Sequence, residues 1–349
     1  MSNQAAPQGI DVDTVTDWLA ARVPGLQAPL TFTQITGGLS NLTFTVADAA
    51  GRRWVLRRPP LGNVLESAHD MGREHKIMAA LQDSAVPVPT LVGLETDTSV
   101  NGAPFYVMDF VDGTVVRDTA TAETLTVEQR RAASESLVDV LAAIHAVDVE
   151  TVGLSDLGRH DGYIERQLKR WYRQYNGSKE QNASIDFPEV DRVHEILAAN
   201  VPEQIGTSIV HGDYRLDNCM IGSDGTVAAV LDWEICTLGD PLADLGLLCV
   251  YWTDPGSEPA LPQASPTALE GFMTTAEVLE RYAAVSGRDL SRIDFYIAFG
   301  YWKLTCIMAG VYARYAAGAM GETDARQSEG FANMVTSLAR LTEEAAQKV

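Results

Sequence analysis

One stretch of polar residues between two apolar segments constrains this chain more than any other. Residues 209–213 read Ile-Val-His-Gly-Asp, and Asn218 follows Asp213 five positions later. The glycine-bounded segment 222–225 then predicts a tight turn between two short apolar strands, the second of which ends at Asp232. Because Asn218 and Asp232 flank the strands of this predicted hairpin, we expect Asp213, Asn218 and Asp232 to converge. Two oxygen donors beside a further carboxylate suit Mg²⁺ and a hydroxyl nucleophile, the groups that phosphoryl transfer requires.

The same residues resemble a known family. The order and spacing of His211, Asp213 and Asn218, with Asp232 further on, are those of the protein-kinase catalytic loop and its metal-binding Asp. Gly212 in place of Arg, and Asp-Trp-Glu in place of Asp-Phe-Gly, point away from protein kinases. The version His-Gly-Asp-Tyr-Arg-Leu-Asp-Asn with Leu-Asp-Trp-Glu resembles the aminoglycoside phosphotransferase and choline kinase-like small-molecule kinases. Within them it is most similar to the phosphotransferase domain that is fused to acyl-CoA dehydrogenases.

This resemblance covers most of the chain and implies a two-lobed α+β architecture of the protein-kinase type. A small, mostly antiparallel β lobe, residues 1–110, would bind the nucleotide. A larger helical lobe, residues 111–349, would carry the catalytic loop and the acceptor site. The implied reaction transfers the γ-phosphoryl group of ATP or GTP to a hydroxyl group of a small molecule.

The resemblance also implies roles for single residues. Asp213 would be the catalytic base, and Asn218 and Asp232 would hold Mg²⁺ between the β- and γ-phosphates. Arg215 lies where protein kinases carry a Lys, so it could stabilise charge on the transferred group. His211 is expected to fix the loop through backbone hydrogen bonds.

The carboxylates around these residues are interpreted as supporting groups. Asp217 is expected to be structural, and Glu234 to lie just outside the metal ligands. Asp240 and Asp244 could be ligands, but related proteins favour a role in which they brace the catalytic loop by hydrogen bonds.

Candidate nucleotide-binding residues lie earlier in the chain. The segment 37–41, Gly-Gly-Leu-Ser-Asn, connects two predicted strands, and its glycines would let Ser40 and Asn41 approach phosphate oxygens. By itself this segment fits a plain hairpin turn better, but the resemblance implies a flap over the phosphates at this position ahead of the catalytic loop. The resemblance implies that backbone groups of three hinge residues would bind the adenine: Asp109, Phe110 and Val111.

One arginine and one glutamate form a predicted pair. Arg57 resembles the nucleotide-binding Lys of protein kinases, but strand periodicity alone leaves open whether Arg57 or Arg58 faces the nucleotide. Glu74 falls on the apolar stripe of a helix predicted over residues 68–81. A carboxylate that is buried there needs a cationic partner, for which Arg57 is the candidate. A solvent-facing Glu74 at the edge of the stripe is the alternative.

Two features of the helical lobe carry weaker indications. His145 ends a helix that begins at the capping box Thr126–Gln129, and it is expected to satisfy local carbonyl groups. Arg166, Arg170 and Arg173 align on one side of a predicted helix and are interpreted as a solvated face, with an acceptor-site wall as the alternative. The acceptor itself stays open among hydroxy-acyl compounds or their CoA esters, amino alcohols, sugars and aminoglycosides.

Composition limits the partners and the compartment. The net charge of −21 argues against a nucleic-acid or anionic-membrane partner. No apolar run approaches the roughly 18 residues that span a bilayer, and the polar N-terminus does not resemble a signal peptide. The four cysteines are widely spaced and apolar in context, so we expect buried free thiols in a reducing cytoplasm. A monomer or a homodimer is expected.

Two other classes of function stay open. A catalytically idle nucleotide-binding or regulatory module would keep the fold and bind ATP without turnover. A metal-dependent hydrolase that uses Asp213 and Asp232 would release phosphate without an acceptor, but it would need additional metal ligands.

Overall fold

The computed structural model describes residues 7–35, 41–62, 70–182, 185–261, 265–316 and 325–349. The chain divides into two compact units: unit 1 comprises residues 1–113 and 228–234, and unit 2 comprises residues 114–227 and 235–349. The segment 228–234, which contains Asp232, therefore belongs to unit 1, although most of that unit lies far earlier in the sequence.

Unit 1 is built on one antiparallel sheet with the strand order β1-β2-β3-β5-β4. Its strands are β1 (Thr31–Ile35), β2 (Leu42–Ala47), β3 (Arg53–Arg58), β4 (Leu91–Glu95) and β5 (Phe105–Asp109), and its helices are α1 (Val12–Ala20), α2 (Met71–Leu81) and α3 (Thr98–Asn101). The connection between β4 and β5 contains the single helical turn of α3, which ends at Gly102, whose φ of 70° suits a glycine.

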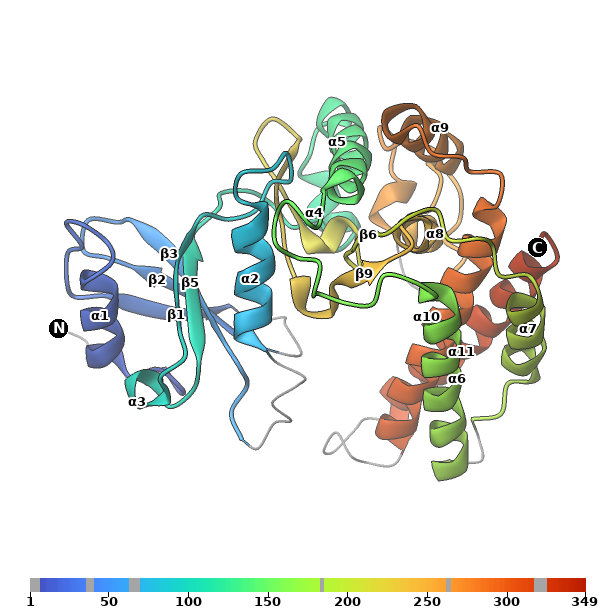
Figure 1. Ribbon diagram of the computed structural model, residues 1–349, viewed down its shortest axis with the longest axis horizontal. Coiled ribbons are helices and arrows are strands. Elements are labelled where there is room, and N and C mark those ends of the chain that lie inside the picture. Colours follow the sequence, from blue (N-terminus) through green and yellow to red (C-terminus); the bar gives the residue numbers. More distant parts are fainter. Residues whose placement is uncertain (1–6, 36–40, 63–69, 183–184, 262–264, 317–324) are drawn as a thin grey trace. The chain divides into compact units, whose positions relative to one another are not determined.

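Alternating side chains separate the two faces of this sheet. Leu56 of β3 packs into a core cluster with Trp18 of α1. Its neighbour Arg57, and Tyr106 of β5, point to the other face, where both contact Glu74 of α2. Helices α1 and α2 therefore cover opposite faces of the sheet (Figure 1).

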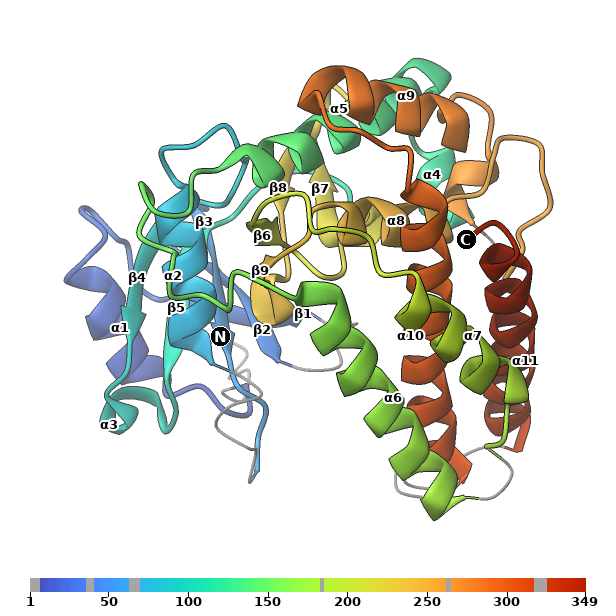
Figure 2. The same ribbon diagram turned by 45° about the vertical axis from the view of Figure 1, so that its right-hand side comes forward.

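Unit 2 is predominantly helical. Its helices are α4 (Thr119–Glu123), α5 (Val127–Ala146), α6 (Tyr163–Gln181), α7 (Pro188–Ala199), α8 (Leu242–Tyr251), α9 (Thr275–Ser286), α10 (Ile293–Ala316) and α11 (Ala325–Ala346). Helix α10 contacts α6, α7, α8 and α11 (Figure 2). It buries side chains around its whole circumference, as expected of a helix in the core of a unit.

Short elements frame the loop 211–218. Strand β6 (Ser208–Val210) pairs antiparallel with β9 (Thr237–Gly239). The 3₁₀ turn η2 (Leu216–Asn218) leads into β7 (Cys219–Ile221), and the turn before β8 (Val227–Val230) is closed by Gly222 N–H, which donates to Thr226 O at 2.8 Å. The turn predicted at 222–225 is therefore present. Two further 3₁₀ turns are η3 (Trp233–Ile235) and η4 (Pro266–Ala268).

Two findings bear on the expectations from composition. The four cysteines are free and buried, as predicted. Within the described ranges, no helix combines the length and the apolar character that crossing a membrane requires.

Candidate functional site

The loop 211–218 begins where strand β6 ends, and its first peptide requires a glycine. Gly212 has a φ of 89°, a region that side-chain-bearing residues rarely adopt. A Cβ atom at this position would also lie 3.0 Å from Ile235 Cδ1. The backbone conformation and the close approach of Ile235 therefore both favour glycine at position 212.

The substitution Gly212→Ala tests this explanation. We expect it to destabilise the chain by more than the roughly 1–2 kcal/mol of a left-handed alanine alone, because the Ile235 contact adds to the backbone strain. Gly256→Ala is the matched control, since Gly256 has a φ of 78° but no atom within 4 Å of an added Cβ. Thermal unfolding of both variants measures the difference, and equal destabilisation would contradict the role of Ile235.

Asp213 is held in place by its neighbours in the loop. Asn218 Nδ2 donates to Asp213 O at 2.8 Å and to its Oδ2 at 2.9 Å. Arg215 Nε lies 3.4 Å from Asp213 Oδ1, and the Asp213 side chain keeps 29% of its surface exposed. His211 Nδ1 accepts from Asp213 N–H at 3.3 Å, which agrees with the expected backbone role of His211. The result is a fixed carboxylate that a small molecule can still reach.

The backbone just before Asp213 is held by two buried side chains. Asp244 of α8 accepts from His211 N–H at 2.6 Å and from Gly212 N–H at 2.8 Å. Lys303 Nζ of α10 donates to Gly212 O at 3.0 Å. Lys303 is buried, and its burial lowers its pKa. Asp244 therefore braces the loop as predicted.

Two residues in this surrounding differ from the sequence expectation. Within the described part of the chain, the Asp240 side chain makes its hydrogen bonds outside the loop. It accepts from Tyr296 O–H at 2.6 Å and from Leu242 N–H at 3.1 Å, so it orders the start of α8. Lys303 was not predicted at all. The available signal was a lone basic residue in the long apolar run of α10.

Arg215 and Asp217 border a pocket in unit 2. Arg215 pairs with Asp217 at 3.0 Å and stacks over the Tyr251 ring at 4.6 Å, so Asp217 has the supporting contact expected of it. The pocket has a volume of about 500 Å³ and is also lined by Arg117 and Trp252. It combines charged and aromatic side chains and is of a size that admits a small molecule.

The predicted arginine stripe on α6 is largely a solvent-facing surface. Arg170 and Arg173 are exposed, and Arg166 is partly buried and donates to Arg159 O at 3.0 Å. None of the three lines the pocket beside Arg215.

Unit 1 contributes a cluster centred on Arg57. Arg57 Nε lies 3.1 Å from Glu74 Oε2, and Arg57 Nη2 lies 2.7 Å from Asp232 Oδ1 and 3.6 Å from Glu234 Oε2. Arg58 points to the other face, where it donates to the carbonyl groups of residues 9 and 101. The register of β3 therefore selects Arg57, and the predicted ion pair with Glu74 is present.

Electrostatics in this cluster follow from burial. Burial raises the pKa of Glu74 to about 7, while Arg57 and the hydrogen bond from Tyr106 O–H at 2.9 Å act in the opposite direction. Burial by itself lowers the pKa of Arg57, but the attraction of Tyr106, Glu74 and Asp232 outweighs it and raises the pKa. Arg57 is therefore a permanent cation beside three carboxyl groups.

Asp232 has a backbone conformation that is uncommon for its residue type. Its φ is 62°, and among the described non-glycine residues it alone has a positive φ. Such conformations cost free energy and concentrate at functional sites. Asp232 lies two residues beyond the end of β8, so this conformation helps to set the direction in which its carboxylate points.

The remaining nucleotide-binding candidates are placed as follows. Asn41 Nδ2 donates to Glu74 Oε1 at 3.2 Å and to Glu234 Oε2 at 3.3 Å, so Asn41 belongs to the Arg57 cluster. Ser40 lies outside the described residues. At the hinge, Asp109 N–H donates to Thr90 O at 2.8 Å and Phe110 N–H to Arg53 O at 3.3 Å. In the described part of the chain, Val111 N–H has no such partner.

Comparisons with known proteins show the family of this chain. A model described as the phosphotransferase enzyme family matches residues 31–296. The chain is 35% identical over 315 residues to acyl-CoA dehydrogenase family member 10 of Mus musculus, which covers 89% of this chain and 29% of that protein. It is 34% identical over 317 residues to acyl-CoA dehydrogenase family member 11 of Homo sapiens, which covers 90% and 40%. The chain thus spans less than half the length of these relatives.

Several solved structures share the fold of this chain. A crystal structure from Ralstonia eutropha JMP134, provisionally named an aminoglycoside phosphotransferase, has a TM-score of 0.81 and 31% identity and covers 97% of this chain and 99% of that one. Choline kinase from Cryptosporidium parvum Iowa II shares the fold with a TM-score of 0.66 and 12% identity, covering 97% and 96%. The streptomycin–ATP complex of APH(2")-IIa does so with 0.58 and 15%, covering 95% and 99%.

The architecture is therefore the two-lobed, protein-kinase-like α+β fold of small-molecule kinases. The chain belongs to the phosphotransferase enzyme family, in agreement with the resemblance that its loop 211–218 carries. Its relatives include the acyl-CoA dehydrogenase fusion proteins that the sequence predicts.

Proposed function

We propose that this protein transfers the γ-phosphoryl group of ATP to a hydroxyl group of a small molecule, with Asp213 as the catalytic base. The observation that carries the proposal is the Asp213 carboxylate, which is fixed by Asn218 at 2.9 Å and remains 29% exposed. A base that orients a hydroxyl must be both held and reachable. Arg215, 3.4 Å from the same carboxylate, is the candidate for stabilising charge on the transferred group.

The proposed Mg²⁺ ligands are Asn218 and Asp232. Asn218 Nδ2 donates to Asp213, so the amide oxygen of Asn218 is the atom proposed to bind the cation. Asp232 adds a carboxylate that is 33% exposed. Oxygen donors of this kind suit Mg²⁺, which takes one or two protein ligands together with phosphate oxygens. When bound, the ion would neutralise charge on the β- and γ-phosphates. Among the described residues, no group of three or more His, Cys, Asp or Glu could hold a metal by itself.

We assign the nucleotide to groups of unit 1. Arg57 is the cation proposed for the phosphates, and Val111, whose N–H has no hydrogen-bond partner among the described residues, is the group proposed for the adenine. Ser40 and Asn41 stay candidates for the phosphate flap. ATP is favoured over the alternative GTP because a fold neighbour was solved with ATP.

The acceptor is assigned by size and position only. The pocket of about 500 Å³ beside Arg215 and Asp217 accommodates a small hydroxylated molecule. Hydroxy-acyl compounds or their CoA esters are favoured by the acyl-CoA dehydrogenase relatives. Amino alcohols, sugars and aminoglycosides are the other classes. We further propose a cytoplasmic protein that acts as a monomer or a homodimer, without a nucleic-acid partner.

Mg²⁺-dependent ADP formation, measured across a panel of these hydroxylated acceptors, tests the proposal. We expect ADP formation that depends on one acceptor class and stops when EDTA removes Mg²⁺. ATP binding without turnover on any acceptor would instead support the idle regulatory module. Phosphate release that needs no acceptor would support the metal-dependent hydrolase.

A further inference from the structure

His145, at the end of α5, takes part in a buried polar chain that the sequence did not predict. From its place at a helix end, His145 was expected to satisfy local carbonyl groups, but its ring has other partners. Instead His145 Nδ1 lies 2.7 Å from Tyr282 Oη of α9, and Nε2 lies 3.4 Å from Asp244 Oδ2 of α8. All three residues are at least 98% buried. The partners come from helices that are far apart in sequence, so only the tertiary structure brings them together.

The hydrogen-bonding capacity of these groups fixes the direction of the chain. Asp244 is an acceptor, and it already receives the amide hydrogens of His211 and Gly212. Nε2 of His145 must therefore carry the hydrogen and donate to Asp244, which leaves Nδ1 to accept from the Tyr282 hydroxyl. Burial lowers the pKa of His145 and favours this neutral ring. For Asp244, burial raises the pKa, but the hydrogen bonds from His145 and from the Gly212 amide help to hold it below its usual value.

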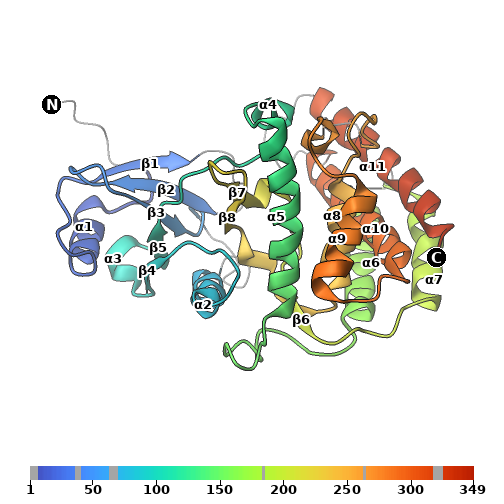
Figure 3. The same cartoon turned by 90° about the horizontal axis from the view of Figure 1, so that it is seen from above.

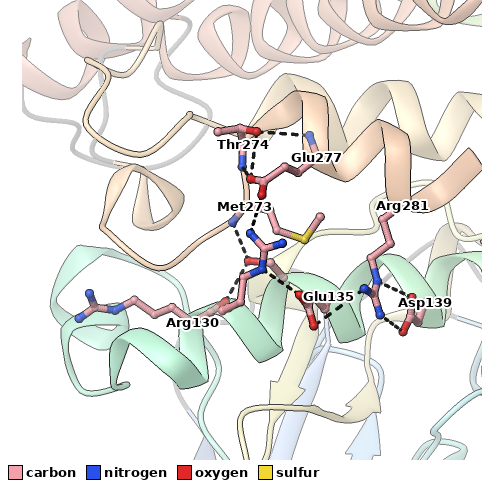
Figure 4. Close-up of polar contacts among 9 residues, drawn as sticks. Arg130, Glu135, Asp139, Met273, Thr274, Glu277 and Arg281 are labelled. Atoms are coloured by element: carbon pink, nitrogen blue, oxygen red, sulfur yellow. Dashed lines mark hydrogen bonds and ion pairs between the residues drawn. The ribbon is translucent and has the colours of Figure 1, made fainter. Parts of the chain in front are cut away.

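Helix α9 is fixed to α5 by a second set of contacts (Figure 4), and the two helices run side by side (Figure 3). Arg281 makes two hydrogen bonds of 2.7 Å to the carboxylate of Asp139. Arg131 Nη1 donates to Glu277 Oε1 at 2.7 Å. Tyr282 directly follows Arg281 in the chain, so the contacts that hold α9 against α5 also help to hold the Tyr282 hydroxyl beside His145.

We propose that Tyr282 and His145 are positioning residues that hold the loop 211–218 in its active geometry through Asp244. This inference rests on the proposed role of Asp213, which lies one residue beyond the two amides that Asp244 binds. Helix α9 thereby influences the loop through His145 and Asp244. Loss of the Tyr282 hydroxyl leaves His145 Nδ1 unpaired, and the bond from Nε2 to Asp244 loses the partner that orients the ring.

The test variant is Tyr282→Phe, which removes one hydroxyl and keeps the packing of the ring. Amide hydrogen exchange reports on the loop without any acceptor, since the His211 and Gly212 amides are the groups that Asp244 protects. We expect exchange of these two amides to become about fivefold to tenfold faster, the effect of losing about one hydrogen bond. In turnover of MgATP, kcat should fall by a similar factor while KM for ATP changes less than about twofold.

Tyr175→Phe is the matched control. Tyr175 is equally buried, and the hydrogen bonds of its hydroxyl are made to a different region: it accepts from Phe187 N–H at 2.8 Å and donates to Phe187 O at 3.3 Å. Faster exchange in both variants alike would mean a global loss of stability and would overturn the proposal, as would an unchanged loop in Tyr282→Phe. If exchange responds as expected but even the unmodified protein turns over no acceptor, the positioning contact stands and the proposed kinase function fails.

Discussion

Replacing Asp213 with Asn is expected to lower acceptor-dependent ADP formation by about 10²–10⁴-fold, the usual contribution of a general base. The substitution removes the charge that accepts the hydroxyl proton but preserves shape and hydrogen-bonding capacity. Because Asn218 Nδ2 donates to Asp213 at 2.9 Å, an Asn side chain can offer its amide oxygen to the same donor, so the loop should fold normally. ADP formation under saturating MgATP measures the loss, and binding of ATP should persist.

Asp217→Asn is the matched control for this prediction. Asp217 lies in the same loop, has a side-chain exposure of 27% against 29% for Asp213, and pairs with the same Arg215. The variant makes the same change of charge at a comparable distance from that cation. We expect its kcat to stay within about tenfold of the unmodified protein, an effect of the size that loss of a hydrogen bond to a charged group produces. A loss as large as that of Asp213→Asn would contradict the assignment of the base to Asp213.

Replacing Arg57 with Met is expected to destabilise the chain by about 3–5 kcal/mol at pH 8, because buried Glu74 must then either stay charged without its cation or take up a proton far above its ordinary pKa. The Glu74 side chain is only 3% exposed and lies 3.1 Å from Arg57 Nε. Met fills much of the same volume, so the loss reports on charge more than on packing. The free energy of unfolding from urea titration measures the effect.

The effect of Arg57→Met should depend on pH. The pKa of Glu74 is raised by burial from 4.5 to about 7 in the folded chain, and removal of Arg57 would raise it further. Any stability that Glu74 contributes as a protonated group is therefore complete below its unfolded pKa and is lost as the pH rises through the folded value. At pH 5 the carboxyl group of the variant can take up a proton, so destabilisation should be smaller than at pH 8.

The double variant Arg57→Met with Glu74→Gln separates charge from structure. Since the amide does not ionise, residue 74 of this variant should make no pH-dependent contribution to the free energy of unfolding over the same range. The double variant should also be more stable at pH 8 than Arg57→Met alone. Equal stability of the two variants at pH 8 would show that the buried charge of Glu74 is not the source of the loss.

The sequence by itself determined the local parts of this molecule. The proximity of Asp213 and Asn218 and the turn at 222–225 could be predicted from residue order, because the chain itself keeps residues a few positions apart close in space. The capping box at Thr126 and Gln129 predicts the start of α5 for the same reason, and the structure contains both of its hydrogen bonds. These features led from a short stretch to the correct family and fold.

The parts that needed tertiary structure involve contacts over long separations in sequence. Arg57 and Arg58 are indistinguishable by strand periodicity, and only the pairing of β3 with its neighbours turns Arg57 toward Glu74. Apart from Asp244, helix α8 is apolar, and nearly all of its residues are buried. It therefore lacks the periodic pattern that identifies a surface helix, and it was not predicted from the sequence.

The groups that surround the loop 211–218 also come from distant parts of the sequence. Lys303 and Tyr282 lie 91 and 137 residues from their partners Gly212 and His145. Nothing in the residues around Lys303 or Tyr282 encodes which buried group each will meet. Local sequence therefore specified the chemistry of the loop, whereas helix packing chose the buried polar groups that hold it, because such partners are selected by proximity in space.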